Sequence, residues 1–278
     1  MRADVWCGSW NWIDERVAWM TDRSHEREPG PIPDWQRIAR QDGQRQWAPP
    51  TRPWVIRQTW RQLLFAHWPV SPAVLRPRIP AGLDLETFGG DAWIGIVPFE
   101  LGGLSANRLT GRAQLTFPEL NVRTYVSVHD KPGVWFFSLD AASLLAVRGA
   151  RATYRLPYFW ATMQMTEQDG WVTFRSQRRG DGSTRFATRY RPTGAEFESA
   201  PGSLERWLTA RYCLYATSRG GHILRADINH DPWLLQPADA EITVNTMASV
   251  QGITLEGPPL LHFAGHTDVV AWGVERVR

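Results

Sequence analysis

The stretch FPELNVRTYV, residues 117–126, alternates polar and apolar residues in the manner of a β-strand. The polar positions are Glu119, Asn121, Arg123 and Tyr125. The intervening positions are Leu120, Val122, Thr124 and Val126. One face of the strand therefore carries a carboxyl, an amide, a guanidinium and a phenol. What that face contacts, water or the protein interior, decides whether it is a site.

Two interpretations of this face are open from the residues alone. On a strand, residues two apart lie about 6.6–6.8 Å apart, so Glu119 and Arg123 are about 13 Å apart and cannot pair directly. Each needs another partner. The face is either the solvated outside of an antiparallel strand or an inward face that recognises a small polar molecule. Burying its charges is costly unless they are paired.

Short strands separated by turns make up most of the chain. The turn HDKPG, 129–133, predicts a hairpin with VWFFSLD, 134–140. Further strand-like runs occur before it at 91–101, at three places between 155 and 192, and in the C-terminal part. The 20 prolines and 23 glycines fit this division into short segments. A mainly β (α+β) chain, folded as a barrel or sandwich, is therefore predicted.

Three segments have apolar residues at helical spacing and are predicted to be short helices: 55–68, 139–151 and 203–216. Asp140 is the predicted N-cap of the second, and Ser203 that of the third. We predict residues 1–50 to be a mobile N-terminal extension, with Met20 an alternative start, because 21–50 is polar and proline-rich. Residues 51–278 are predicted to form a single domain.

Charge and motifs exclude several classes of function. The net charge is only +3, so the arginine-rich run 175–192 is interpreted as a solvated hairpin and not as a nucleic-acid site. No apolar run reaches the ~18–20 residues that cross a bilayer. The N-terminus lacks a secretory pattern, so a cytoplasmic protein is predicted. The two cysteines suggest neither a disulfide framework nor a zinc site. We predict no metal and no cofactor, and a homo-oligomer remains open.

The sequence resembles a known family in several blocks that occur in consistent order from about residue 52 to the C-terminus. These blocks are LLFAHWPV, GIVPFEL, FPELNVRTYV, KPGVWFFSLDAASLLAVRGAR, LPYFWA, SLERWLTARYCLY and HDPWLLQ. Together they resemble the YqjF-like family of uncharacterised conserved proteins, a domain of unknown function. That family is similar in fold to acetoacetate decarboxylase. The resemblance thus implies an acetoacetate-decarboxylase-like antiparallel β-barrel with a few short helices, around a small-molecule cavity.

The resemblance does not carry the decarboxylase chemistry with it. In acetoacetate decarboxylase an interior lysine, kept neutral by an adjacent cation and by desolvation, forms an imine with the substrate. The only lysine here is Lys131, in the predicted turn HDKPG. We expect it to be exposed to water, with an ordinary pKa and a protonated amine. Arg123 cannot replace it, because a guanidinium is neither nucleophilic nor deprotonated near neutral pH.

The resemblance favours the inward interpretation of the strand 117–126. Arg123 is then predicted to anchor a carboxylate or other anion, Asn121 and Tyr125 to orient it, and Glu119 to transfer a proton. Four further candidates for ligand binding are His67, Arg211, Tyr212 and His230. The histidines are also explained as hydrogen-bonded packing residues. Arg211 is also explained by an ion pair, with Glu119 as one candidate partner.

Three functions are compatible with these residues. The favoured hypothesis is a protein that binds a small anionic or carboxylate-bearing metabolite, with catalysis left open. The alternative is a non-catalytic interaction or scaffold protein that uses its Trp-rich N-terminal segment and its many aromatic residues. The third is a decarboxylase-like enzyme that works without an imine-forming lysine.

Overall fold

The protein is mainly β, as predicted. The computed structural model describes residues 34–106 and 114–277. The strands are β1 (Ile56–Val70), β2 (Asp84–Leu85), β3 (Ala92–Ala106), β4 (Leu115–Val128), β5 (Lys131–Ala141), β6 (Tyr158–Gln168), β7 (Trp171–Arg178), β8 (Arg185–Pro192), β9 (Phe197–Glu198), β10 (Cys213–Thr217), β11 (Ile223–His230), β12 (Leu234–Asn245), β13 (Leu260–Ala271) and β14 (Glu275–Arg276). The helices are α1 (Trp35–Arg40), α2 (Pro72–Leu75), α3 (Leu144–Thr153) and α4 (Leu204–Thr209), with 3-10 turns η2 (Arg76–Arg78) and η3 (Ser249–Gln251).

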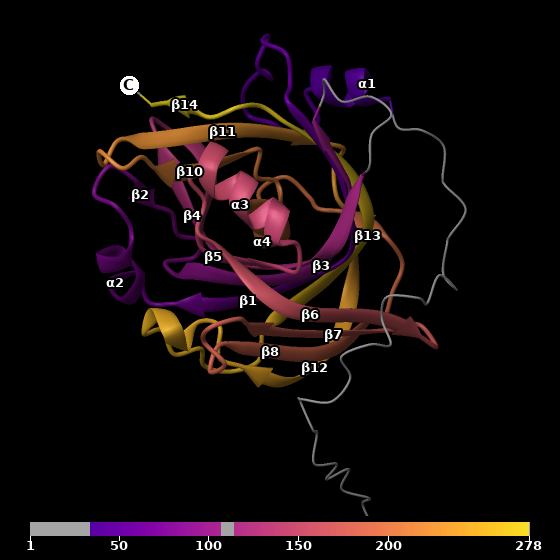
Figure 1. The fold of residues 1–278 in the computed structure, drawn as a ribbon. Coiled ribbons are helices and arrows are strands. Elements are labelled where there is room, and N and C mark those ends of the chain that lie inside the picture. The colour runs from indigo at the N-terminus through magenta and orange to yellow at the C-terminus, as the bar shows by residue number, and fades with distance from the viewer. Residues whose placement is uncertain (1–33, 107–113, 278) are drawn as a thin grey trace, which may run out of the picture. The chain divides into compact units, whose positions relative to one another are not determined.

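The strands pair into a ring (Figure 1). The order β5-β6-β7-β8-β12-β13-β1-β3-β4 returns to β5, because β4 pairs with both β3 and β5. Strands β10 and β11 close a second path between β5 and β13. The pairing departs from the all-antiparallel prediction at β5, which runs parallel to β6 and to β10. Parallel neighbours need a crossover connection, and α3 provides it between β5 and β6.

Both faces of β4 are buried. On one face, Leu120 and Val122 belong to a core that also contains Phe174 of β7. On the other face, Phe117 belongs to a second buried cluster with Val147 of α3. Helix α4 joins the same face through Leu208, which is clustered with Tyr125. Helices α3 and α4 thus pack on the face of β4 opposite to Leu120 and Val122, where Figure 1 shows them among β3, β5, β10, β11 and β13.

Three local predictions are wrong. Residues 56–70 form strand β1, because β-branched and aromatic side chains suit a strand that pairs with both β3 and β13. The helix predicted over 203–216 ends at Thr209, and β10 follows to pair with β11. Asp140 is not an N-cap: it lies in β5, and Ser143 caps α3 by accepting a hydrogen bond from the Ala146 N–H.

The boundary near residue 50 also differs from the structure. Residues from Asp34 onward belong to the same compact unit as the strands. Asp34 caps α1 through its carboxylate, and Ile38 is buried in a cluster with Trp54 and Trp272. The burial of Ile38 attaches this segment to the strands. Residues 1–33, which include the alternative start Met20, lie outside the described residues. Within residues 34–106 and 114–277 no helix is long and apolar enough to cross a membrane.

Candidate functional site

The polar row of β4 faces inward. Glu119 is 3% exposed, Asn121 6% and Tyr125 0%, while Arg123 is half-buried. The interpretation of this row as a water-exposed outer face is therefore wrong. Both faces of the strand are buried, one lined by polar and the other by apolar side chains. This gives the same alternation in the sequence as a strand with one solvent-exposed face and one buried face.

A glycine makes room for the centre of this row. Gly95 of β3 pairs with Arg123 on one side and with His67 of β1 on the other. A Cβ at Gly95 would lie 3.0 Å from the His67 ring and 3.4 Å from Cγ of Arg123. The absence of a side chain lets the imidazole and the arginine stem lie next to each other across the strand.

His67 joins the row through Tyr125. Its Nε2 lies 2.6 Å from the Tyr125 hydroxyl, and the His67 ring stacks on Phe65. Burial, and next the charge of Arg123, holds the pKa of His67 well below its usual value, so the imidazole is neutral near pH 7. Its Nδ1 is buried without a hydrogen-bond partner.

Arg123 has aromatic neighbours but no described counter-charge. Its guanidinium carbon is 5.4 Å from the ring centroid of Phe65 and 5.8 Å from that of Tyr125. Among the described residues, no carboxylate lies within ion-pair distance of Arg123, and its buried Nε has no hydrogen-bond partner. Oδ1 of Asn121 is also buried without a partner. Buried polar atoms are nearly always hydrogen-bonded, to protein or to ordered water, so these atoms are candidate contacts for water or for a ligand.

Arg211 and Tyr212 lie next to this row. Arg211 forms an ion pair with Glu86 and donates to the Trp207 carbonyl at 2.6 Å. The partner of Arg211 is therefore Glu86 and not Glu119, the partner considered from the sequence. The Arg211 guanidinium also lies 4.9 Å from the ring centroid of Tyr125. Tyr212 stacks on His230 with ring centroids 4.7 Å apart.

His230 is a neutral histidine that faces the same region. Its Nδ1 donates to the Asp231 carbonyl at 2.6 Å, because a carbonyl oxygen can only accept. Burial lowers the pKa of His230 to about 4, and the charges of Arg45 and Arg123 contribute in the same direction. The electrostatic effect of Arg123 on both His230 and His67 places its charge near the two imidazoles.

Glu119 stands apart from these residues. The Tyr158 hydroxyl donates to its two carboxyl oxygens at 3.2 and 3.1 Å. Burial raises the pKa of Glu119 to about 8, and the charge of Asp140 acts in the same direction, so the carboxyl is mostly protonated at neutral pH. No described hydrogen bond or ion pair connects Glu119 with Arg123. The structure thus brings His67, Arg123 and Arg211 into contact with Tyr125 and pairs Tyr212 with His230. Glu119 lies at the other end of the row.

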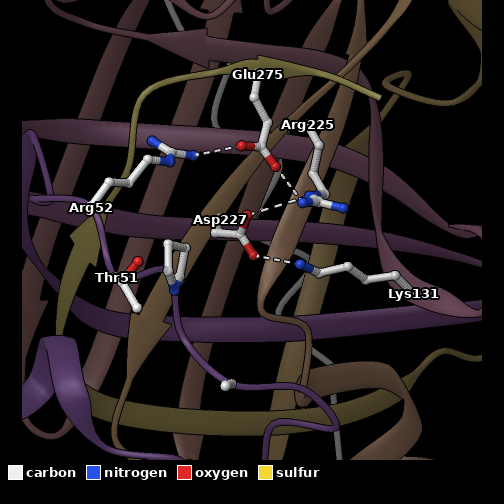
Figure 2. Close-up of a pocket in the computed structure, with 8 residues that line it drawn as sticks. Thr51, Arg52, Lys131, Arg225, Asp227 and Glu275 are labelled. Carbon is white, nitrogen blue, oxygen red and sulfur yellow. Dashed lines mark hydrogen bonds and ion pairs between the residues drawn. The ribbon is translucent and has the colours of Figure 1, made fainter. Parts of the chain in front are cut away.

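A separate charged pocket surrounds Lys131 (Figure 2). It has a volume of about 300 Å³ and is lined by Ala48, Pro50, Thr51, Arg52, Lys131, Arg225, Asp227 and Glu275. Lys131 is 17% exposed, and its Nζ lies 2.9 Å from Oδ1 of Asp227. None of the residues predicted from the sequence to bind a ligand lines this pocket.

The expectation for Lys131 is therefore wrong. The turn consists of His129 and Asp130, both with positive φ, and Lys131 is already the first residue of β5. The segment before β1 covers its side chain, with Nζ 4.4 Å from the ring centroid of Trp47. This burial lowers the pKa of Lys131, although the hydrogen bond to Asp227 acts in the opposite direction. An exposed hairpin tip would have left the pKa unchanged.

Comparison with known proteins supplies the family. Residues 57–268 match DUF2071, which is described as an uncharacterised conserved protein. The chain belongs to the DUF2071 family. A relative in Bacillus subtilis (strain 168), "Uncharacterized protein YqjF", is 47% identical over 228 residues, which cover 80% of this chain and 93% of that protein. The resemblance to YqjF found in the sequence is thus confirmed.

Solved structures similar to this DUF2071 protein share its fold. The enduracididine biosynthesis enzyme MppR complexed with pyruvate gives a TM-score of 0.59 at 11% identity, over 84% of this chain and 96% of MppR. Acetoacetate decarboxylase from Legionella pneumophila gives 0.57 at 11% identity, over 90% and 98%. The acetoacetate-decarboxylase-like fold predicted from the sequence is confirmed. At this level of identity the comparison shows the fold alone.

Sequence reasoning missed the charged residues around Lys131 in this DUF2071 chain. Asp227 receives hydrogen bonds from Arg45, Trp47, Lys131 and Arg225. One signal was available, because Arg225 and Asp227 lie two apart on a strand and so on one face. No local sequence pattern could predict the hydrogen bonds that Arg45 and Trp47 donate to Asp227, because these residues lie about 180 positions before it in the chain.

The raised pKa of Glu119 predicts a pH dependence of stability. Its pKa is about 8 in the fold and 4.5 in an ordinary setting, so the folded state holds the proton more tightly. The associated stability is complete below pH 4.5 and is lost as the pH rises to about 8. Glu119→Gln keeps an acceptor for Tyr158 and cannot ionise. The free energy of unfolding of Glu119→Gln should equal that of wild type near pH 4.5 and exceed it by about 3–5 kcal/mol above pH 8.

Urea denaturation of both proteins at several pH values measures this difference. Glu196→Gln changes an exposed glutamate and is the control. Its free energy of unfolding should differ from that of wild type by the same amount at every pH. A difference in free energy of unfolding between Glu119→Gln and wild type that does not change with pH would show that the pKa of Glu119 is the same in the folded and unfolded states.

Proposed function

We propose that this protein binds a small anionic metabolite of the cytoplasm, one that carries a carboxylate, against the polar row of β4, with Arg123 as the anchor. The observation that carries the proposal is the half-buried Arg123 guanidinium, which has no carboxylate partner among the described residues. A cation removed from water without a partner is destabilising, and a bound anion offsets that cost.

The charges of the neighbouring groups support an anion in particular. Burial keeps His67 and His230 neutral near pH 7, and it keeps Glu119 mostly protonated. Arg211 is already neutralised by Glu86. The charge of Arg123 is thus left unmatched, and a guanidinium binds carboxylates with two parallel hydrogen bonds.

The buried polar atoms without a hydrogen-bond partner indicate which groups the ligand carries besides its carboxylate. His67 Nδ1 and the Asn121 amide offer hydrogen bonds beside Arg123. A carboxylate with a neighbouring keto or hydroxyl oxygen would use both kinds of group. MppR, which shares the fold, has been solved with pyruvate, a molecule of this type. The proposal gives Glu119 the role of proton donor, for a ligand long enough to extend along the row to its protonated carboxyl.

The alternative of an interaction protein has less support. Its Trp-rich segment lies within residues 1–33, outside the described residues. The large apolar residues that the described part of the chain exposes come from five separate places: Val55, Leu145, Trp160, Leu234 and Val250.

Thermal stabilisation by small carboxylic acids tests the proposal. Pyruvate, lactate and acetoacetate should each be tested as a saturating series, with the neutral amide of each acid as the matched ligand control. At least one acid should raise the midpoint of unfolding of wild type, and its amide should not. Arg123→Gln should weaken that binding by about 30-fold or more, because truncating one partner of a buried charge pair costs about 2–5 kcal/mol.

Folding of the variant separates binding from stability. Because no described carboxylate depends on Arg123, Arg123→Gln should unfold at the wild-type denaturant midpoint or above it. Arg61→Gln, at an arginine that pairs with Glu100 near the surface, should bind like wild type. Equal stabilisation of Arg123→Gln and wild type by the same acid would refute the role of Arg123.

A further inference from the structure

Asp227 is the centre of the charged pocket. It is 1% exposed, and its Oδ1 accepts hydrogen bonds from Arg45 at 3.1 Å, Trp47 at 3.2 Å and Lys131 at 2.9 Å. Its Oδ2 accepts from Nε of Arg225 at 3.3 Å. Its single negative charge is thus shared among three cations, and its two oxygens, which offer about four acceptor sites, are nearly saturated.

Glu275 is the second carboxylate of the pocket. It pairs with Nη2 of Arg225 and, at 3.4 Å, with Nη2 of Arg52 (Figure 2). It is half-exposed, as is Arg52. Arg225 thus lies between the two carboxylates, while Arg52 and Lys131 each contact only one of them.

Positive charge exceeds negative charge in this cluster. Three cations line the pocket, Arg52, Lys131 and Arg225, and Arg45 lies behind Asp227. Against these four cations stand the two carboxylates, which leaves an excess of two positive charges. Unused donors accompany the excess, because an ammonium has three N–H groups and a guanidinium five. Lys131 gives one of them to Asp227, and Arg52 gives one to Glu275.

A purely structural network explains only part of this arrangement. Arg45 and Trp47 attach the segment before β1 to Asp227, and the Arg45 side chain is fully buried. That attachment needs neither Arg52 nor a lysine held away from water at a lowered pKa. Both line a hollow of about 300 Å³, which is large enough for a small ligand.

We propose that this pocket is a second anion site, which binds a doubly charged oxyanion group between Arg52, Lys131 and Arg225. Its chemistry is that of a phosphate group or a pair of carboxylates, either of which matches the excess of two charges and accepts several hydrogen bonds. The site shares no residue with the row of β4, so it is independent of the function proposed for Arg123.

Titration of the full chain with simple anions tests the site. Inorganic phosphate and malonate represent the two sources of double charge, and acetate and chloride are the controls, all at constant ionic strength. Phosphate, malonate or both should bind saturably by calorimetry, with acetate at least about tenfold weaker. Arg52→Gln should weaken this binding about tenfold. Arg61→Gln is a matched control, because Arg61 is 40% exposed beside a glutamate at 3.2 Å, against 37% and 3.4 Å for Arg52.

The only lysine provides a direct readout. In protein labelled with 13C-lysine, the side-chain signals arise from Lys131 alone, and the bound dianion should shift them and raise the pH at which they titrate. Arg123→Gln should leave this response intact.

Three outcomes would overturn the proposal. One is a wild-type response that follows ionic strength whatever the anion. Another is an equal loss of binding in Arg61→Gln and Arg52→Gln. The last is binding that disappears in Arg123→Gln while the Lys131 signals stay unchanged, which would locate the anion on β4.

Discussion

Asp227→Asn is expected to lower the free energy of unfolding by about 3–5 kcal/mol, because it removes one partner of a buried ion network. Asp227 is the only described carboxylate that pairs with Arg45, whose side chain is fully buried, and with Lys131. Burial alone would raise the pKa of Asp227, but the hydrogen bond and charge of Lys131 and the charge of Arg225 hold it below 3.8. Its contribution is therefore present at neutral pH and is lost as the pH falls through that lowered pKa.

Urea denaturation at pH 7 measures this loss. The control Glu241→Gln removes an exposed carboxylate that accepts two hydrogen bonds from Arg189, and it should leave the denaturation midpoint nearly unchanged. Both variants therefore remove a carboxylate that accepts hydrogen bonds from arginine, one in the interior and one at the surface. Equal effects would mean that the network around Asp227 is as solvated as a surface pair.

Arg178→Met is also expected to lower the free energy of unfolding, by about 3–5 kcal/mol at neutral pH. Arg178 donates to Asp140 through Nε at 3.1 Å and Nη2 at 2.7 Å, and its guanidinium lies 3.7 Å from the ring centroid of Phe159. Asp140 is fully buried, and burial raises its pKa even with Arg178 present. Without the arginine, the Asp140 carboxylate should protonate at a still higher pH. The difference in free energy of unfolding between wild type and Arg178→Met should therefore shrink as the pH falls.

A double-mutant cycle isolates the pair. The double variant Asp140→Leu, Arg178→Met leaves no charge unpaired and should recover most of the stability that Arg178→Met loses, because apolar replacements of a buried pair are often neutral. If the double variant is instead as unstable as the sum of the two single variants, packing of the long side chains and not charge pairing explains the loss.

The β-rich class of the fold was accessible from local sequence patterns, and its acetoacetate-decarboxylase-like form from the family resemblance. The alternation in residues 117–126 identified β4, and the turn before Gly133 identified its hairpin with β5. The prediction failed where pairing with distant strands overrides local spacing. Residues 56–70 carry apolar residues at helical intervals, yet β3 and β13 on either side make them a strand.

The candidate site was accessible to a different extent. The residues of the row left its outward and inward orientations both open, and only the family resemblance favoured the inward one. His67 and His230 were candidates because each is closely followed by proline and tryptophan. The surroundings of Lys131 could not be predicted, because Arg45 and Trp47 cover it from far away in the chain. A short turn motif predicts the backbone conformation of the turn, but it does not predict which distant residues of the chain cover it.

The pairing of β1 with β13 has a consequence during synthesis. Ile56 pairs with Ala271 and His67 with Leu260, so one edge of β1 stays open until roughly two hundred further residues have been made. At a synthesis rate of about 5–20 residues per second, that interval is on the order of 10–40 s. During it, the apolar run Leu63–Ala66 is an unprotected edge that can pair with other nascent chains. Folding of such a topology is slow, and we expect the emerging chain to depend on ribosome-associated chaperones until its last long strand appears.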